Sequence, residues 1–236
     1  MPPFAPAKLR TPCVQVAGIR TADELRMLLA HGVDYLGFPL RLPVHTPDLS
    51  ETATAALIQS HRVHPQAVCI TYETDPMAVA RLCRFLGVQT VQLHGGFAPD
   101  ALCALRRTVP ELTILKSLIL GQTPLENMLQ ALPAMEPWVD GFLTDTFDPG
   151  SGASGATGRT HDWAMSAAIV QATSRPVILA GGLSPANVAT AIATVHPAGV
   201  DAHTGLENSQ GDKDPERVQR FVREAKRALA RLRGCN

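Results

Sequence analysis

The sequence predicts an α/β fold, a single (β/α)8 TIM barrel domain that spans residues 1–236. Short apolar or β-branched runs alternate eight times with amphipathic segments along the 236 residues. The runs are almost continuously apolar, which is typical of parallel strands covered by helices. No linker or shift of composition divides the chain. A doubly wound open sheet is the alternative that the same alternation allows.

Each predicted strand is a short apolar run that ends at a turn or at a polar residue. In chain order, the strands are expected at Cys13–Ala17, Tyr35–Phe38, Ala67–Tyr72, Thr90–Leu93, Thr113–Ser117, Gly141–Asp145, Pro176–Ala180 and Gly199–His203.

Each predicted helix follows a strand and carries apolar residues at helical spacing. In chain order, the helices are expected at Ala22–His31, Ser50–Val63, Pro76–Leu86, Pro99–Thr108, Pro124–Leu132, Asp162–Thr173, Pro185–Val195 and Pro215–Arg233. Asp162 and Asp214 are expected to cap two of these helices. Ser184 and Pro185 predict another helix start, with serine at the cap and proline at the first helical position.

Composition limits the partners that the chain is expected to bind. Lys+Arg and Asp+Glu both number 21, so the formal net charge is zero. This balance provides no electrostatic reason to expect nucleic acid or an anionic membrane as a partner. No apolar run approaches membrane-spanning length, and "MPPFAPAKLR" lacks the apolar core of a secretory signal, so we expect a cytoplasmic protein. The sequence carries no sign of the oligomeric state.

The five cysteines do not predict a metal site or disulfides. They are odd in number, have no CxxC spacing and fall mostly in apolar contexts, at Cys13, Cys69, Cys83, Cys103 and Cys235. Reduced and mostly buried thiols are therefore expected.

Glycines after two predicted strands indicate a phosphate site. Gly181 and Gly182 stand between a strand and a helix, where the backbone can approach a ligand and the helix directs N–H groups toward it. Thr204 and Gly205 follow the last strand in the same way. Such barrels commonly bind phosphate at the loops after strands seven and eight. These four residues are therefore expected to hold a substrate phosphate.

Further polar residues follow the carboxyl ends of the predicted strands, where the active sites of barrels lie. Their joint position at one rim makes Asp145 and His203 candidate site residues, together with Gln15, Arg41, His45, His94 and Lys116 as candidates for contact with substrate.

Several of these stretches resemble the phosphoribosylanthranilate isomerase family, whose enzymes act in tryptophan biosynthesis. The resembling segments are "GVDYLGF", "VQLHG", "TDT" followed by "TGRTHDW", "LAGGLSPANV", and "GVDAHTGLE" followed by "GDKD". The resemblance implies a barrel that performs an Amadori rearrangement of a phosphoribosyl amine, without metal or cofactor. It implies that Asp145 is the general acid toward the furanose ring oxygen. It also implies that Gly181, Gly182 and Gly205 bind the phosphate.

The sequence departs from the family at the general base. The family has Lys-Ile-Cys-Gly at the first strand, with the cysteine as base at C2, whereas this chain has Gln15-Val16-Ala17-Gly18. Cys13 has the same strand parity as Ala17, but four residues of about 3.3 Å each place it over 10 Å deeper in the barrel. A further departure follows the second strand. "PLRLPVHTPDLS" stands there in place of the family's Ser-x-Arg for the anthranilate carboxylate, so Arg41 or His45 could serve.

A rim histidine is the expected replacement for the missing base, because imidazole titrates near neutral pH. His203 is favoured over His94 and His45, since the last strand neighbours the first in a closed barrel. Two other functions stay open at this point. One is a sugar-phosphate lyase or aldolase with a Schiff base on Lys116. The other is a non-catalytic phosphosugar-binding barrel.

Overall fold

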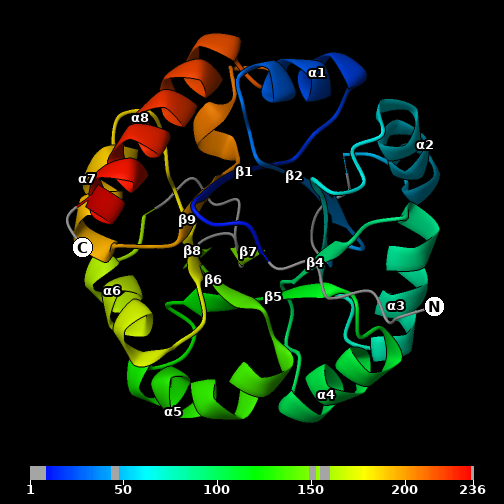
Figure 1. Cartoon of the computed structure of the whole chain (residues 1–236), viewed down its shortest axis with the longest axis vertical. Coiled ribbons are helices and arrows are strands. Elements are labelled where there is room, and N and C mark those ends of the chain that lie inside the picture. Colours follow the sequence, from blue (N-terminus) through cyan, green and yellow to red (C-terminus); the bar gives the residue numbers. More distant parts are fainter. Residues whose placement is uncertain (1–8, 44–47, 149–152, 155–159, 235–236) are drawn as a thin grey trace.

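The computed structural model describes residues 9–43, 48–148, 153–154 and 160–234. Within them, eight parallel strands pair in the order β5-β4-β3-β2-β1-β9-β8-β6, and a β5–β6 pairing closes the ring (Figure 1). The strands are β1 Cys13–Ala17, β2 Tyr35–Leu40, β3 Ala67–Thr71, β4 Thr90–Leu93, β5 Thr113–Leu120, β6 Gly141–Asp148, β8 Val177–Leu179 and β9 Gly199–Ala202. The closed ring confirms the predicted (β/α)8 barrel. The open-sheet alternative is wrong.

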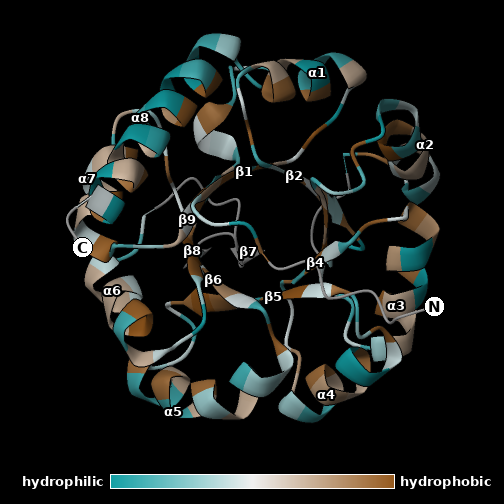
Figure 2. Cartoon of the chain, viewed as in Figure 1, coloured by the Kyte–Doolittle hydropathy of each residue, from teal (hydrophilic) through white to brown (hydrophobic). Residues whose placement is uncertain are grey.

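Helices surround the strands on the outside of the ring (Figure 1). The described helices are α1 Ala22–Ala30, α2 Glu51–His61, α3 Pro76–Leu86, α4 Pro99–Thr108, α5 Leu125–Met135, α6 Trp163–Ala172, α7 Val188–Val195 and α8 Pro215–Gly234, with 3-10 turns η1 Glu136–Trp138 and η2 Thr204–Leu206. Figure 2 shows apolar residues on the strands and polar residues on the outward helix faces, the pattern that periodicity predicted. Among the described residues, no helix combines the length and the apolar character needed to cross a membrane.

Three strands, β2, β5 and β6, run further than predicted, and the extension of β6 changes the position of Asp145. The prediction ended β6 at Asp145, but β6 continues because Ile119 and Leu120 of β5 pair with Asp145 and Thr146. A short strand that was not predicted, β7 (Ala153–Ser154), pairs antiparallel with the end of β6. Asp145 therefore lies inside an extended strand, where the pairing with β5 fixes its backbone.

The predicted start of α7 is wrong, because the helix begins at Val188 and not at Pro185. The Ser184 N–H donates to Oδ1 of Asn187 at 2.8 Å, and Nδ2 of Asn187 donates to the carbonyl of Gly182 at 3.0 Å. Asn187 thus closes a turn before the helix and holds Gly182 in place. The caps predicted at Asp162 and Asp214 are confirmed by their bonds to Ala164 N–H and to the N–H groups of Glu216 and Arg217.

The strand period of two divides the buried side chains into two groups. Alternate residues face the helices and form the large outer core. The others face the barrel axis, and their apolar members are Cys13, Ala17, Tyr35, Val68, Ile70, Leu143, Ile178 and Ala180. Polar residues also lie buried in the barrel strands, among them Gln15, Gln92, Asp145 and Asp201. A buried polar layer inside a barrel marks the place to search for chemistry.

The described cysteines are free thiols, and Cys13, Cys69 and Cys83 are buried while Cys103 is half-buried. This agrees with the prediction of reduced thiols. Cys235 lies outside the described residues.

Glu24 joins the loop after β1 to the loop after β9. The side chain of this α1 residue is buried, and its carboxylate accepts from Arg20 N–H at 2.7 Å and from Lys213 N–H at 2.8 Å. The first and last units of the barrel are therefore tied together at its carboxyl end.

We expect Glu24→Ala to lower the free energy of unfolding by about 2 kcal/mol, because two backbone donors lose a charged acceptor. Chemical denaturation measures the change. Glu126→Ala, an exposed glutamate in the first turn of α5, is the control and should change stability little. Equal effects of the two substitutions would contradict the tie.

Candidate active site

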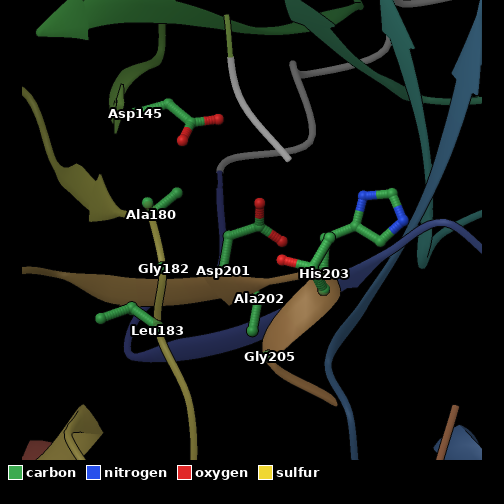
Figure 3. A pocket seen from close by; sticks show the side chains of 10 residues that line it. Asp145, Ala180, Gly182, Leu183, Asp201, Ala202, His203 and Gly205 are labelled. Carbon is green, nitrogen blue, oxygen red and sulfur yellow. The ribbon is translucent and has the colours of Figure 1, made fainter. Parts of the chain in front are cut away.

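A pocket opens at the carboxyl end of β6, β8 and β9 (Figure 3). It has about 290 Å³ of space, part of it open to solvent. Its lining residues are Asp145, Ala180, Gly181, Gly182, Leu183, Asp201, Ala202, His203, Thr204 and Gly205. The structure thus brings together both residues predicted to be catalytic and all four predicted to hold phosphate.

Asp145 is the carboxyl group that β6 contributes to the pocket. It is 7% exposed, and one of its oxygens accepts from the Thr146 N–H at 2.7 Å. The other oxygen lies 3.7 Å from Nε2 of His94. Burial raises the pKa of Asp145 to about 7, against the smaller lowering by the Thr146 hydrogen bond. Asp145 can therefore hold a proton near neutral pH, as a general acid must.

Asp201 is a second buried carboxyl group, on β9, and it is not among the predicted site residues. It is 6% exposed, and its Oδ1 has no hydrogen-bond partner among the described residues. Burial raises its pKa to about 7, and the charge of Asp145 contributes to the rise. The sequence does contain a signal for Asp201. Asp201 precedes His203 by two residues in the predicted strand Gly199–His203, so the strand period of two places both side chains on the same face of that strand.

The two glycine loops touch one another across the pocket. A Cβ on Gly205 would meet the carbonyl oxygen of Leu183 at 2.0 Å, so only glycine fits there. Gly181 and Gly182 have φ values of +90° and +63°, in the left-handed region that favours glycine. Their N–H groups donate to no backbone carbonyl among the described residues. The loops therefore combine close backbone approach with donors, as a phosphate site requires.

His203 lines the pocket, but its ring is held against the rim. A Cβ on Gly18 would lie 2.0 Å from Nε2 of His203, so the ring covers Gly18. The same Nε2 is 3.2 Å from Oε1 of Glu207, and Nζ of Lys213 donates to that oxygen at 2.6 Å. Burial raises the pKa of Glu207, but hydrogen bonds from His203 and Lys213 outweigh burial and lower this pKa to about 2. Figure 3 places the His203 ring on the far side of Asp201 from Asp145.

Gln15 and His94 lie within the polar layer of the barrel. Nε2 of Gln15 donates to Oε1 of Gln92 at 2.8 Å, and Nε2 of Gln92 lies 3.3 Å from Nδ1 of His94. This chain of side chains leads from β1 through β4 to Asp145. The structure therefore brings both residues close to the acid, although neither lines the pocket itself.

Lys116 and Arg41 are not brought to the pocket. Lys116 pairs in register with Leu93 and Phe142, which belong to the outer core, so its side chain leaves the strand on the outer side. Its Nζ donates to the carbonyl of Gly95 at 3.0 Å and to the carbonyl of Ser117 at 2.6 Å. Arg41 binds Glu51 at 2.8 Å and Glu73 at 3.2 Å at the exposed end of β2.

His45 lies outside the described residues.

Comparisons with known proteins agree with this geometry. The model of the family described as N-(5'phosphoribosyl)anthranilate (PRA) isomerase matches residues 14–224. The chain is 35% identical to N-(5'-phosphoribosyl)anthranilate isomerase 2 of Methanosarcina mazei, over 94% of this chain and 98% of the relative. It is 38% identical to the N-(5'-phosphoribosyl)anthranilate isomerase of Haloferax volcanii, over 91% and 93% of the two chains. The chain belongs to this family.

A solved structure shares the fold. It is a phosphoribosyl anthranilate isomerase in complex with reduced 1-(o-carboxyphenylamino)-1-deoxyribulose 5-phosphate, 23% identical, with a TM-score of 0.73. The match covers 91% of this chain and 98% of that one.

Within the family match, Ala17 is buried and brings no titratable group to the inner face of β1. Cys13 is no substitute, because it lies against Gly199 at the other end of the strand pair and burial raises the pKa of its thiol to about 12. This agrees with the prediction that Cys13 lies too deep to act.

Inorganic phosphate should raise the melting temperature of the protein by mass action, if the glycine loops bind it. Gly182→Leu should abolish this rise, because leucine is strained at a φ of +63° and fills the loop. Thermal unfolding with and without phosphate measures the effect. Gly96→Ala, at a glycine with no atom near its Cβ position, is the control and should keep the full rise. A rise that persists in Gly182→Leu would place the anion elsewhere.

Asp145→Asn should stabilise the protein above pH 7. The folded pKa of about 7 exceeds the unfolded value of about 3.9, so the stability of the native protein falls as pH rises between these values. Asparagine does not ionise, so the variant does not lose this stability as the pH rises. Its melting temperature should exceed that of the native protein at pH 8 and equal it near pH 4. The exposed Asp100→Asn should show no such trend. A lower melting temperature of Asp145→Asn at pH 8 would contradict the raised pKa.

Proposed function

We propose that this chain catalyses the Amadori isomerisation of N-(5'-phosphoribosyl)anthranilate to the corresponding aminoketose, in the synthesis of tryptophan. The observation that carries the proposal is a buried carboxyl group able to hold a proton, Asp145, in one pocket with the two glycine loops. Family membership supports the same substrate. The substrate is a small phosphorylated sugar derivative.

The pocket suits the first step of this reaction. The N–H groups of the loops at Gly181, Gly182, Thr204 and Gly205 would hold the 5-phosphate and so orient the ribose ring. Asp145 then gives its proton to the furanose ring oxygen. The C1–O bond breaks toward that oxygen, while the nitrogen lone pair forms a C1=N bond. A single orienting anchor and one positioned acid are enough for ring opening.

The second step needs a base that removes the C2 proton, and Ala17 does not supply it. The predicted replacement, His203, stays a prediction. Its Nε2 is 3.2 Å from Glu207, which leaves Nδ1 as the atom that would have to act.

The other predicted functions find less support. A Schiff base on Lys116 requires the amine in the pocket, whereas Nζ is bound to two backbone carbonyls on the outer side of the strand. A barrel that only binds a phosphosugar would explain Ala17, and it predicts binding without turnover. A biosynthetic enzyme of this kind would work in the cytoplasm.

Expression of this chain should restore growth without tryptophan to a bacterial strain that lacks the isomerase. The purified protein should convert the substrate to the aminoketose, and chromatography measures the conversion. A strain that expresses the folded protein and still fails to grow would contradict the proposed function and favour a binding role.

Asp145→Asn should lower kcat by about 10²–10⁴-fold, because it removes the general acid. The rise in melting temperature caused by phosphate should remain, since the glycine loops are unchanged. Steady-state kinetics and thermal unfolding measure the two effects. Full turnover by this variant would remove Asp145 from the mechanism.

A further inference from the structure

We propose that Asp201 is the general base that removes the C2 proton, in place of the thiol that Ala17 replaces. The inference rests on the proposed function and names the residue that the reaction still lacks.

The placement of Asp201 is the first argument. It lies on β9, hydrogen-bonded to β1, where its Cα partner is Gln15, two residues before Ala17. The base therefore moves from the end of β1 to the neighbouring strand. Asp145 and Asp201 line the same pocket, and Figure 3 shows both side chains in it. A substrate in that space would have the acid on one side and Asp201 on the other.

The free oxygen is the second argument. Oδ1 of Asp201 is buried and has no hydrogen-bond partner among the described residues. A buried carboxyl oxygen without a partner costs free energy, so it calls for a role beyond stability. Removal of a proton from carbon needs such an oxygen, because a lone pair already engaged by a donor is a weaker base.

The competing groups are engaged elsewhere. His203 covers Gly18 and pairs through Nε2 with Glu207. His94 directs Nε2 toward Asp145 and Nδ1 toward Gln92, so it serves the acid. The thiol of Cys13 lies deeper, against Gly199. Asp201 is the carboxyl group of the pocket that the acid step leaves unused.

Titratable and polar groups on neighbouring elements act on the pKa of Asp201. Asp145 on β6 raises the pKa of Asp201, while a hydrogen bond from Gln15 on β1 and the charge of Lys213 before α8 lower it. Cys13 on β1 is close enough for the charge of Asp201 to raise its pKa. Burial raises the pKa of both carboxyl groups to about 7, so near neutral pH each is present partly as the acid and partly as the carboxylate. The proposed reaction uses the form in which Asp145 is protonated and Asp201 is ionised.

The step balances without a co-reactant. After ring opening, the Asp201 carboxylate takes the proton from C2. The C2–H electron pair forms C1=C2, and the electrons of the C1=N bond return to nitrogen. The 2-hydroxyl then loses its proton to the Asp145 carboxylate, and C1 receives the proton that Asp201 holds. The product is the aminoketose, and both carboxyl groups return to their first state.

Substrate carrying deuterium at C2 of the ribose tests the assignment. Asp201→Asn should lower kcat by about 10²-fold or more. Its kinetic isotope effect on kcat should exceed that of the native enzyme, because proton removal from C2 then limits the rate. Asp145→Asn should lower kcat without raising the isotope effect, since ring opening comes first. Asp100→Asn, the same chemical change at an exposed site, should alter neither quantity.

Binding of the reduced product analogue, measured by calorimetry, shows whether Asp201→Asn is folded. If it is not folded, Asp201→Ala replaces it, and added formate should restore part of the lost kcat by supplying a carboxylate. A folded Asp201→Asn that keeps kcat within about threefold, an isotope effect that does not rise, or no response to formate would overturn the assignment. A raised isotope effect in His203→Ala instead would give the role to that histidine. No turnover by the native enzyme would overturn the proposed function first, and the base assignment with it.

Discussion

Removal of water from two carboxyl groups is the interaction on which the site depends. A closed barrel sends every second side chain of a strand toward the axis, and there the strands shield it from solvent. Asp145 and Asp201 occupy such positions on β6 and β9, with pKa values raised to about 7. Burial by the strands of the ring is thus what lets Asp145 hold a proton near neutral pH.

The contacts at the carboxyl end serve to hold this pair and its loops in place. Asn187 fixes Gly182 from the start of α7, and Glu24 fixes the segment at Lys213 from α1. The pairing of β5 with β6 past Asp145 fixes the acid itself. The contact of Glu24 and the pairing of β5 with β6 join segments of different βα units, so the site depends on the assembled ring and not on any one unit.

Periodicity predicted the fold well because each βα unit is a local pattern. The residues of the glycine loops and Asp145 were also within reach of the sequence, since strand ends and glycine pairs are local signals. What the sequence did not show was which residues face one another. Lys116 stands next to a strand end, yet its parity sends it outward. The sequence favoured His203 over Asp201, which the strand period places on the same face. The ion pair of His203 with Glu207 depends on the folded structure, so the sequence did not predict it.

The contact between Gly205 and the carbonyl of Leu183 also bears on inhibitor chemistry. The backbones of the two loops are in close contact, since a Cβ at Gly205 would overlap that oxygen at 2.0 Å. The two loops therefore form one continuous wall of the pocket. A compound designed for this pocket can contact both loops with one anionic group. Its selectivity has to come from the opposite end, where Ala17 brings no thiol to the inner face of β1.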